Sequence, residues 1–85
     1  MTQQELFEEA YNKLNARSWY HLAQLMDLEE RELRFYRKGE RTPDVYACFK
    51  LAEILGKSQA EILAAIHASS EKNENKRLYF KRFLR

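Results

Sequence analysis

Signals that start a helix recur along this chain at short intervals, and they restrict its fold more than any other feature. Each is a capping residue followed by apolar residues at helical spacing. Two of them have the capping-box pattern, in which a hydroxyl residue and a later Glu bond each other's backbone amides. With only two Gly and one Pro to make sheet turns, the chain is expected to be all-helical. The signals are Thr2 with Glu5, Ser18, Thr42 with Pro43, and Ser58 with Glu61.

Five helices are expected to follow from these signals. Gly39 and Gly56 end the third and fourth of them, as glycine commonly does. The chain has 85 residues, of which 45% are hydrophobic, so it can bury one modest core. We therefore expect one domain over residues 1–68. Its helices are placed at residues 3–15, 19–26 and 29–38, from Thr42–Pro43 to Gly56, and from Ser58 onward.

Residues 69–85 form a basic extension of this domain. Residues 71–85 hold six basic and two acidic side chains, a net charge of +4, whereas residues 1–70 hold nine and eleven, a net charge of −2. Large apolar residues alternate with the basic ones, which favours a helix that packs on the domain or on a second protomer. Contacts to phosphate, or to an anionic membrane surface as the least favoured option, are the alternatives. The apolar residues are Leu78, Tyr79, Phe80, Phe83 and Leu84.

Residues 18–38 fit two short helices joined by a tight turn. Such helices cross at a steep angle only where a small residue lets them approach, and Ala23 is in that position. Trp19 and Tyr20 are expected to fill the junction of the first three helices. Apolar residues then recur at the spacings that bury this unit against the core. They are Leu22, Met26, Leu28, Leu33 and Tyr36.

The segments after this unit carry a family resemblance. Residues 37–43, Arg-Lys-Gly-Glu-Arg-Thr-Pro, resemble the G-x-x-x-P segment that leaves the recognition helix in lambda-repressor/Cro-like proteins. Residues 51–56 and 58–63 look like the fourth and fifth helices of that family, so the resemblance covers about residues 5–68. More narrowly, the chain is similar to small regulatory proteins of filamentous-phage-like prophages.

The resemblance implies a five-helix, lambda-repressor-like helix-turn-helix domain that binds double-stranded DNA. Its second helix would cross the DNA backbone and its third would enter the major groove. A homodimer would present two third helices about 34 Å apart to a (pseudo)palindromic operator. The expected function is sequence-specific transcription regulation, most simply repression, in a phage or mobile element. An accessory recombination factor that bends DNA is a variant within the same class.

The resemblance also assigns the base contacts. The matching positions are Glu30, Arg31 and Phe35, with Arg34 close by. Helical geometry agrees in part, because a third helix with Leu33 facing inward turns Arg31 and Phe35 outward. Arg31 is then suited to guanine O6 and N7, and Phe35 to a thymine methyl group.

The phosphate contacts are assigned to the edges of this surface. Lys38 and Arg41 are expected to clamp phosphates of the DNA backbone. The amides at the start of the second helix, near Ser18, are expected to bind another phosphate.

Two features depart from this pattern. Asp27 stands where the family has a glycine in the turn, although Asp tolerates left-handed backbone better than most residues. Glu29, Glu30 and Glu32 place acids on the first turn of the third helix, where they would face a polyanion. These acids favour the alternative function, a protein-interaction module or inhibitor that docks an acidic ridge on a basic protein partner. The C-terminal tail is a second candidate surface for such a partner.

No catalytic, metal or cofactor site is expected. His21, Cys48 and His67 lie on three different predicted helices, and no motif joins them. The chain is therefore expected not to be an enzyme. The first ten residues carry acids where a signal peptide carries basic residues, and no apolar run is long enough to span a membrane. A cytoplasmic protein is expected.

Overall fold

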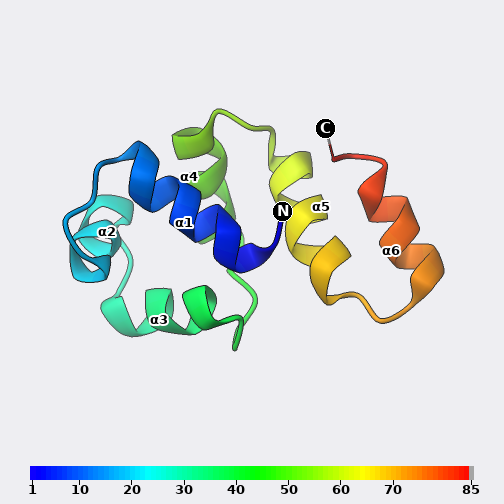
Figure 1. Cartoon of the computed structure of the whole chain (residues 1–85), viewed down its shortest axis with the longest axis horizontal. Helices are drawn as coiled ribbons and strands as arrows, with labels where there is room; N and C mark the ends of the chain where they lie inside the picture. Colours follow the sequence, from blue (N-terminus) through cyan, green and yellow to red (C-terminus); the bar gives the residue numbers. More distant parts are fainter. Residues whose placement is uncertain (85) are drawn as a thin grey trace.

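The computed structural model describes residues 1–84, and within that range it holds six α-helices and no strand. The expectation of an all-helical chain is confirmed. Figure 1 shows α1 across the middle of the molecule, α2 and α3 at one end, and α6 beyond α5 at the other. The helices are α1 (Gln3–Lys13), α2 (Trp19–Met26), α3 (Glu30–Lys38), α4 (Val45–Leu55), α5 (Gln59–Ser70) and α6 (Glu74–Lys81).

The N-cap residues of α1, α2 and α5 are the predicted ones, but the full capping box forms only in α1, since the Glu61 carboxylate accepts from the Ser58 hydroxyl, at 3.3 Å, and not from the Ser58 amide. The Thr2 hydroxyl accepts a hydrogen bond from the Glu5 amide at 3.2 Å, and the Glu5 carboxylate accepts one from the Thr2 amide at 3.0 Å. Ser18 and Ser58 each accept a hydrogen bond from the amide three residues later. Satisfying these amides fixes where a helix starts, because the first turn has no carbonyls of its own to bond them.

The predicted start of the fourth helix is wrong by two residues. Asp44, not Thr42, is the N-cap of α4, and its carboxylate accepts from the Ala47 amide at 2.9 Å. Pro43 is buried ahead of the helix, and its carbonyl accepts a hydrogen bond from the Cys48 thiol at 3.8 Å. Asp44 prevails over Thr42 because its charge also interacts favourably with the helix dipole.

The turn between α2 and α3 is tight and left-handed at Asp27, which has φ 56° and ψ 47°. The Leu28 amide donates to the Ala23 carbonyl at 2.8 Å and closes the end of α2. The expectation that Asp27 occupies left-handed backbone in place of a glycine is confirmed. Glu29 then caps α3 without a side-chain hydrogen bond, so α3 starts one residue later than predicted.

The core lies between α1 and the helices that surround it. Phe7 of α1 stacks on Tyr36 of α3 with ring centroids 5.9 Å apart. The apolar residues expected to be buried in the α2–α3 unit are all buried except Leu28, which is half-buried. Each fully buried large side chain contributes about 1.5–3 kcal/mol to folding. The largest are Leu6, Phe7, Leu22, Met26, Leu33, Leu51, Ile62 and Ile66.

The extension folds back on the domain. Helix α6 packs against α5, where the Phe80 ring lies 5.6 Å from the His67 ring, and Leu84 packs against the core. Leu78 and Tyr79, each 52% exposed, leave an apolar surface on α6. Helix α5 continues to Ser70, so the first two residues of the predicted extension belong to it. Arg85, the last residue of the extension, lies outside the described residues. None of the described helices is both long and apolar enough to cross a membrane.

Candidate functional site

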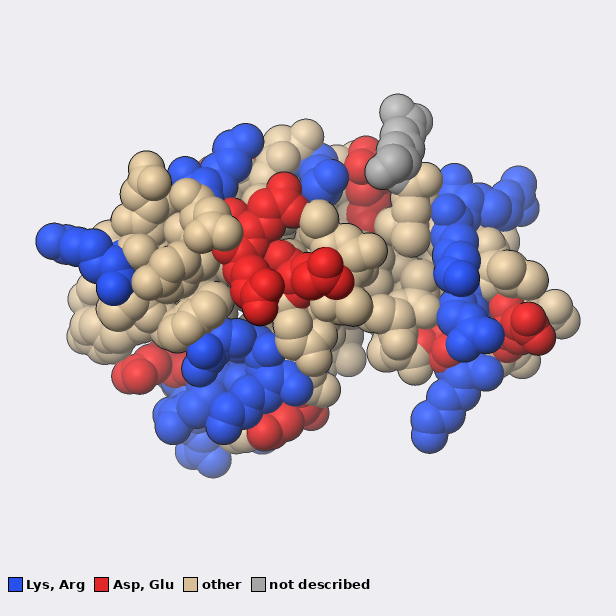
Figure 2. Space-filling view, in the orientation of Figure 1, with Lys and Arg blue, Asp and Glu red and all other residues tan. Residues whose placement is uncertain are grey.

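The exposed side of α3 carries the densest group of basic side chains near the middle of the chain. Arg31, Arg34 and Lys38 are exposed, while Leu33 and Tyr36 of the same helix are buried in the core. Figure 2 shows this group over α3, a second column of Lys and Arg over α6, and an acidic patch over α1 between them. The geometric expectation that Leu33 faces inward and Arg31 outward is confirmed.

Two guanidinium groups lie near the Phe35 ring. The Arg41 guanidinium carbon is 4.3 Å from the centre of the Phe35 ring, and that of Arg31 is 5.5 Å from it. Both contacts are favourable, because the face of an aromatic ring carries partial negative charge. The two cations repel each other, however, so an anion or a hydrogen-bond acceptor that binds both would relieve that repulsion. We call Arg31, Phe35 and Arg41 the α3 cluster.

The segment after α3 turns back toward Phe35 at Gly39, and a side chain of α1 holds it there. Gly39 has φ 75°, and the amide after it, that of Glu40, donates to the Phe35 carbonyl at 2.9 Å. The Gln3 side-chain amide then donates to the Arg41 carbonyl at 2.7 Å and to the Tyr36 carbonyl at 2.9 Å. This fixes the main chain at Arg41 although it lies outside any helix.

Gln3 anchors this surface, and its role was not predicted from the sequence. It is the only buried polar residue among those described, at 7% exposure. One signal was available. Gln3 occupies the face of the first predicted helix that Leu6, Phe7 and Ala10 define at helical spacing. A polar residue on such a face needs a hydrogen-bond partner from another part of the chain.

Three acids lie at the start of α3, Glu29 as its N-cap and Glu30 and Glu32 on its first turn. Glu29 and Glu32 line a shallow hollow with the α3 cluster, while Glu30 lines a different one with Trp19 and Arg37. Glu32 is half-buried and accepts a hydrogen bond from the Tyr36 hydroxyl at 3.4 Å. Glu32 is therefore partly engaged within the protein, while Glu29 and Glu30 are adjacent and exposed.

Trp19 connects three helices, as expected. Its ring lies 4.6 Å from the Tyr11 ring of α1, and the Arg37 guanidinium of α3 lies 4.4 Å above it. Arg37 therefore belongs to the scaffold. The expectation for Tyr20 is wrong, because Tyr20 is 56% exposed. It follows Trp19 by one residue on α2, and a helix turns adjacent side chains about 100° apart.

The start of α2 is organised by its own side chains. The exposed Ser18 hydroxyl accepts from the His21 amide at 3.0 Å, and His21 Nδ1 accepts from the Arg17 amide at the same distance. Ser18 keeps its own O–H as a donor. His21 is thus part of a helix cap.

The other candidate residues do not assemble into a site. Burial, and then the nearby Asp44 carboxylate, raise the pKa of the Cys48 thiol, which favours its protonated, unreactive form. Among residues 1–84 no group of three His, Cys, Asp or Glu side chains is placed to hold a metal ion. His67 packs on Phe80, far along the chain from both His21 and Cys48.

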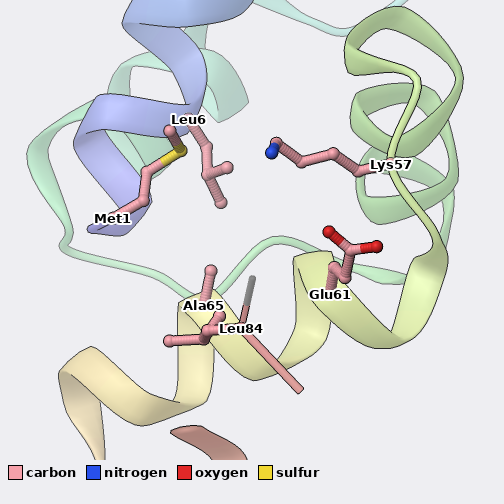
Figure 3. Close-up of a pocket in the computed structure, with 6 residues that line it drawn as sticks. All are labelled: Met1, Leu6, Lys57, Glu61, Ala65 and Leu84. Carbon is pink, nitrogen blue, oxygen red and sulfur yellow. The ribbon is translucent and has the colours of Figure 1, made fainter. Parts of the chain in front are cut away.

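A separate hollow lies between α1 and α5. Figure 3 shows Met1 and Leu6 on one side of it, Ala65 and Leu84 on the other, and Lys57 and Glu61 extending into it. Its lining is mainly apolar, and none of its residues comes from α2 or α3. It is a gap left where the C-terminal segment folds over the core.

Comparisons with protein-family models, with curated proteins and with solved structures find no match for this chain. Its surfaces are therefore interpreted from the chemistry of their own residues. The α3 surface is the richest of them, since it combines exposed guanidinium groups, an aromatic ring close to two of them, and a main chain fixed from α1.

Proposed function

We propose that this chain is a sequence-specific DNA-binding regulator of the helix-turn-helix type, with α3 as the helix that enters the major groove. The observation that carries the proposal is the two-sided character of α3. Leu33 and Tyr36 hold it in the core, while Arg31 and Arg34 are exposed and Phe35 is half-exposed. An α-helix fits the major groove, and an Arg fork matches guanine there. The tight left-handed turn before α3 fits the same interpretation.

The proposed contacts divide into base and phosphate contacts. Arg31, Arg34 and Phe35, together with the exposed Glu30, face the bases, where a carboxylate can accept from cytosine N4. Lys38 is exposed at the end of α3, which suits a phosphate contact. Ser18 and the adjoining amides at the start of α2 supply a phosphate contact on the other side of the turn.

The proposed active form is a homodimer on a (pseudo)palindromic operator. Leu78 and Tyr79 of α6 and Phe83 just after it are exposed, and they supply an apolar surface that a second protomer can bury. Sedimentation velocity tests this, with Tyr79→Ser expected to shift the protein toward monomer. A wild-type monomer at concentrations that saturate DNA would contradict the dimer.

Repression of a few promoters in a phage or mobile element, in the cytoplasm, is the biological setting that the family resemblance favours. A protein-interaction module is the alternative. It requires Glu29, Glu30 and Glu32 to act as one ridge, and the half-burial of Glu32 and its hydrogen bond from the Tyr36 hydroxyl weigh against it.

The test is binding of the purified protein to DNA fragments from its own gene neighbourhood, with random DNA as the control. Selective binding that weakens about 10³–10⁵-fold between low and moderate salt is expected for a protein that makes several phosphate contacts. The double variant Arg31→Ala/Arg34→Ala should lose selectivity, whereas Lys13→Ala, an exposed basic residue of α1, should not. Equal weak binding to every fragment, or none, would overturn the proposal.

A further inference from the structure

We propose that the α3 cluster recognises a methylated pyrimidine followed by a guanine, that is, a TG step or a 5-methylcytosine–guanine step. This inference rests on the proposed DNA-binding function and assigns its sequence preference. It starts from the two guanidinium groups close to one ring, Arg31 at 5.5 Å and Arg41 at 4.3 Å from the centre of Phe35.

The contact between Arg31 and Phe35 places an apolar surface next to a guanine-binding group. A guanidinium that bonds guanine O6 and N7 lies close to the plane of that base. The neighbouring pyrimidine is stacked about 3.4 Å away along the strand, and the C5 methyl group of a thymine projects into the same groove. With Arg31 on the guanine, the Phe35 ring beside it is the surface that this methyl group would meet.

Arg41 is a positioning residue in this arrangement. Its guanidinium covers the Phe35 ring more closely than Arg31 does, and the Gln3 amide holds its main chain at 2.7 Å. A residue that only clamps phosphate needs a positive charge and no such stack. Lysine would keep the charge but would lose the planar group that stacks on the ring.

The acids beside the cluster extend the preference to methylated cytosine. Glu29 and Glu32 line the same hollow as Arg31, Phe35 and Arg41. A carboxylate there can accept from the N4 amino group of cytosine. 5-Methylcytosine carries the methyl group of thymine and, unlike thymine, an N4 donor for such a carboxylate, so the site would accept it at the same position, whereas uracil and unmodified cytosine lack the methyl group that contacts Phe35.

The experiment begins with selection of bound duplexes from a random DNA library by the full-length protein. The enriched sequence is expected to contain a TG step in each half-site. Replacing the thymine of that step by uracil should weaken binding about fourfold per half-site, the value of one buried methyl group. Placing cytosine there should weaken binding as well, and 5-methylcytosine should restore it.

Two variants separate positioning from charge. Arg41→Lys should remove the thymine-to-uracil difference and leave the salt dependence of binding unchanged. The matched control Arg34→Lys, on an exposed residue that makes no contact with Phe35, should retain the difference. Both positions are exposed, so neither change should disturb folding.

The outcomes are distinct. An enriched sequence without a TG step, or equal affinity for the thymine and uracil duplexes, would overturn this inference and leave the proposed function standing. A thymine-to-uracil difference that survives in Arg41→Lys would also overturn the role given to Arg41. No enrichment of any sequence would overturn the proposed function and this inference together.

Discussion

The side-chain amide of Gln3 donates a 2.7 Å hydrogen bond to the main-chain carbonyl of Arg41, across 38 positions of sequence. The same amide bonds the Tyr36 carbonyl, so the first turn of α1 holds both the end of α3 and the segment that follows it. The α3 surface is therefore fixed from outside the helices that form it.

Gln3→Ala should lower the free energy of unfolding by about 1–3 kcal/mol, because two carbonyls would lose their only described side-chain donor. Urea denaturation measures this. Asn12→Ala, on an exposed residue of the same helix, is the matched control and should change stability far less. If both variants unfold at the same urea concentration, the anchor contributes nothing measurable.

Asp27 should respond to substitution according to its left-handed backbone, φ 56°. Asp27→Val should destabilise the protein by about 1–2 kcal/mol, because a β-branched side chain clashes with that conformation. Asp27→Gly should unfold at an equal or higher urea concentration. Gln24→Gly, at an exposed helical position of α2, should instead cost about 1 kcal/mol. A Val variant as stable as the wild type would contradict the assigned turn.

Stability should fall in alkaline solution. Burial is the main cause that raises the pKa of the Cys48 thiol above 9.0 and that of the Tyr36 phenol above 10.0. The unfolded chain therefore releases these protons at lower pH than the folded one. The stabilisation is complete below about pH 8 and is lost as the pH rises through the folded pKa values. Urea midpoints measured from about pH 7 to about pH 11 test this. Tyr36→Phe and Cys48→Ala should each flatten the decline, and a wild-type midpoint that stays constant with pH would refute it.

Leu84 should contribute to stability although it follows the last helix. It packs against the core, so Leu84→Ala is expected to cost about 1–2 kcal/mol, less than for a fully buried leucine. Leu63→Ala, on an exposed leucine of α5, should stay within about 0.5 kcal/mol of the wild type. Thermal or urea unfolding measures the stability of the two variants. Equal stabilities of Leu84→Ala and Leu63→Ala would mean that the C-terminal segment is not docked in solution.

Lys38 and Arg31 should affect DNA binding differently. Arg31→Ala is expected to cost about 1–3 kcal/mol and to relax the preference at one base pair. Lys38→Ala should weaken binding to all sequences alike and reduce the salt slope by about 1. Titrations of operator and mismatched duplexes at several salt concentrations measure both effects. A preference that changes in Lys38→Ala would contradict its assignment to phosphate.

The local structure of this protein was largely predictable from its sequence. Helix starts at Thr2, Ser18 and Ser58 depend on neighbouring residues alone, and so does the turn at Asp27. The start of α4 was not predictable in the same way, because Thr42 and Asp44 are both good capping residues. The burial of Pro43, which lies between them, depends on the tertiary fold.

The candidate site was predictable only where it lies on one helix. The outward faces of Arg31 and Arg34 follow from the period of α3. The position of Arg41 does not follow from that period, since it depends on the left-handed backbone at Gly39 and on the hydrogen bond from the Gln3 side chain. The two hollows that these acids line depend on which neighbours α3 has on each side.

Helix α6 is attached to the molecule through α5 and through Leu84. A segment with few buried contacts can open while the rest of the domain stays folded. Amide hydrogens of α6 should therefore exchange with deuterium through local openings, ahead of those in α1 and α4. The protein would then behave as two cooperative units, a slowly exchanging body that carries α3 and a fast-exchanging arm that carries the basic column of α6.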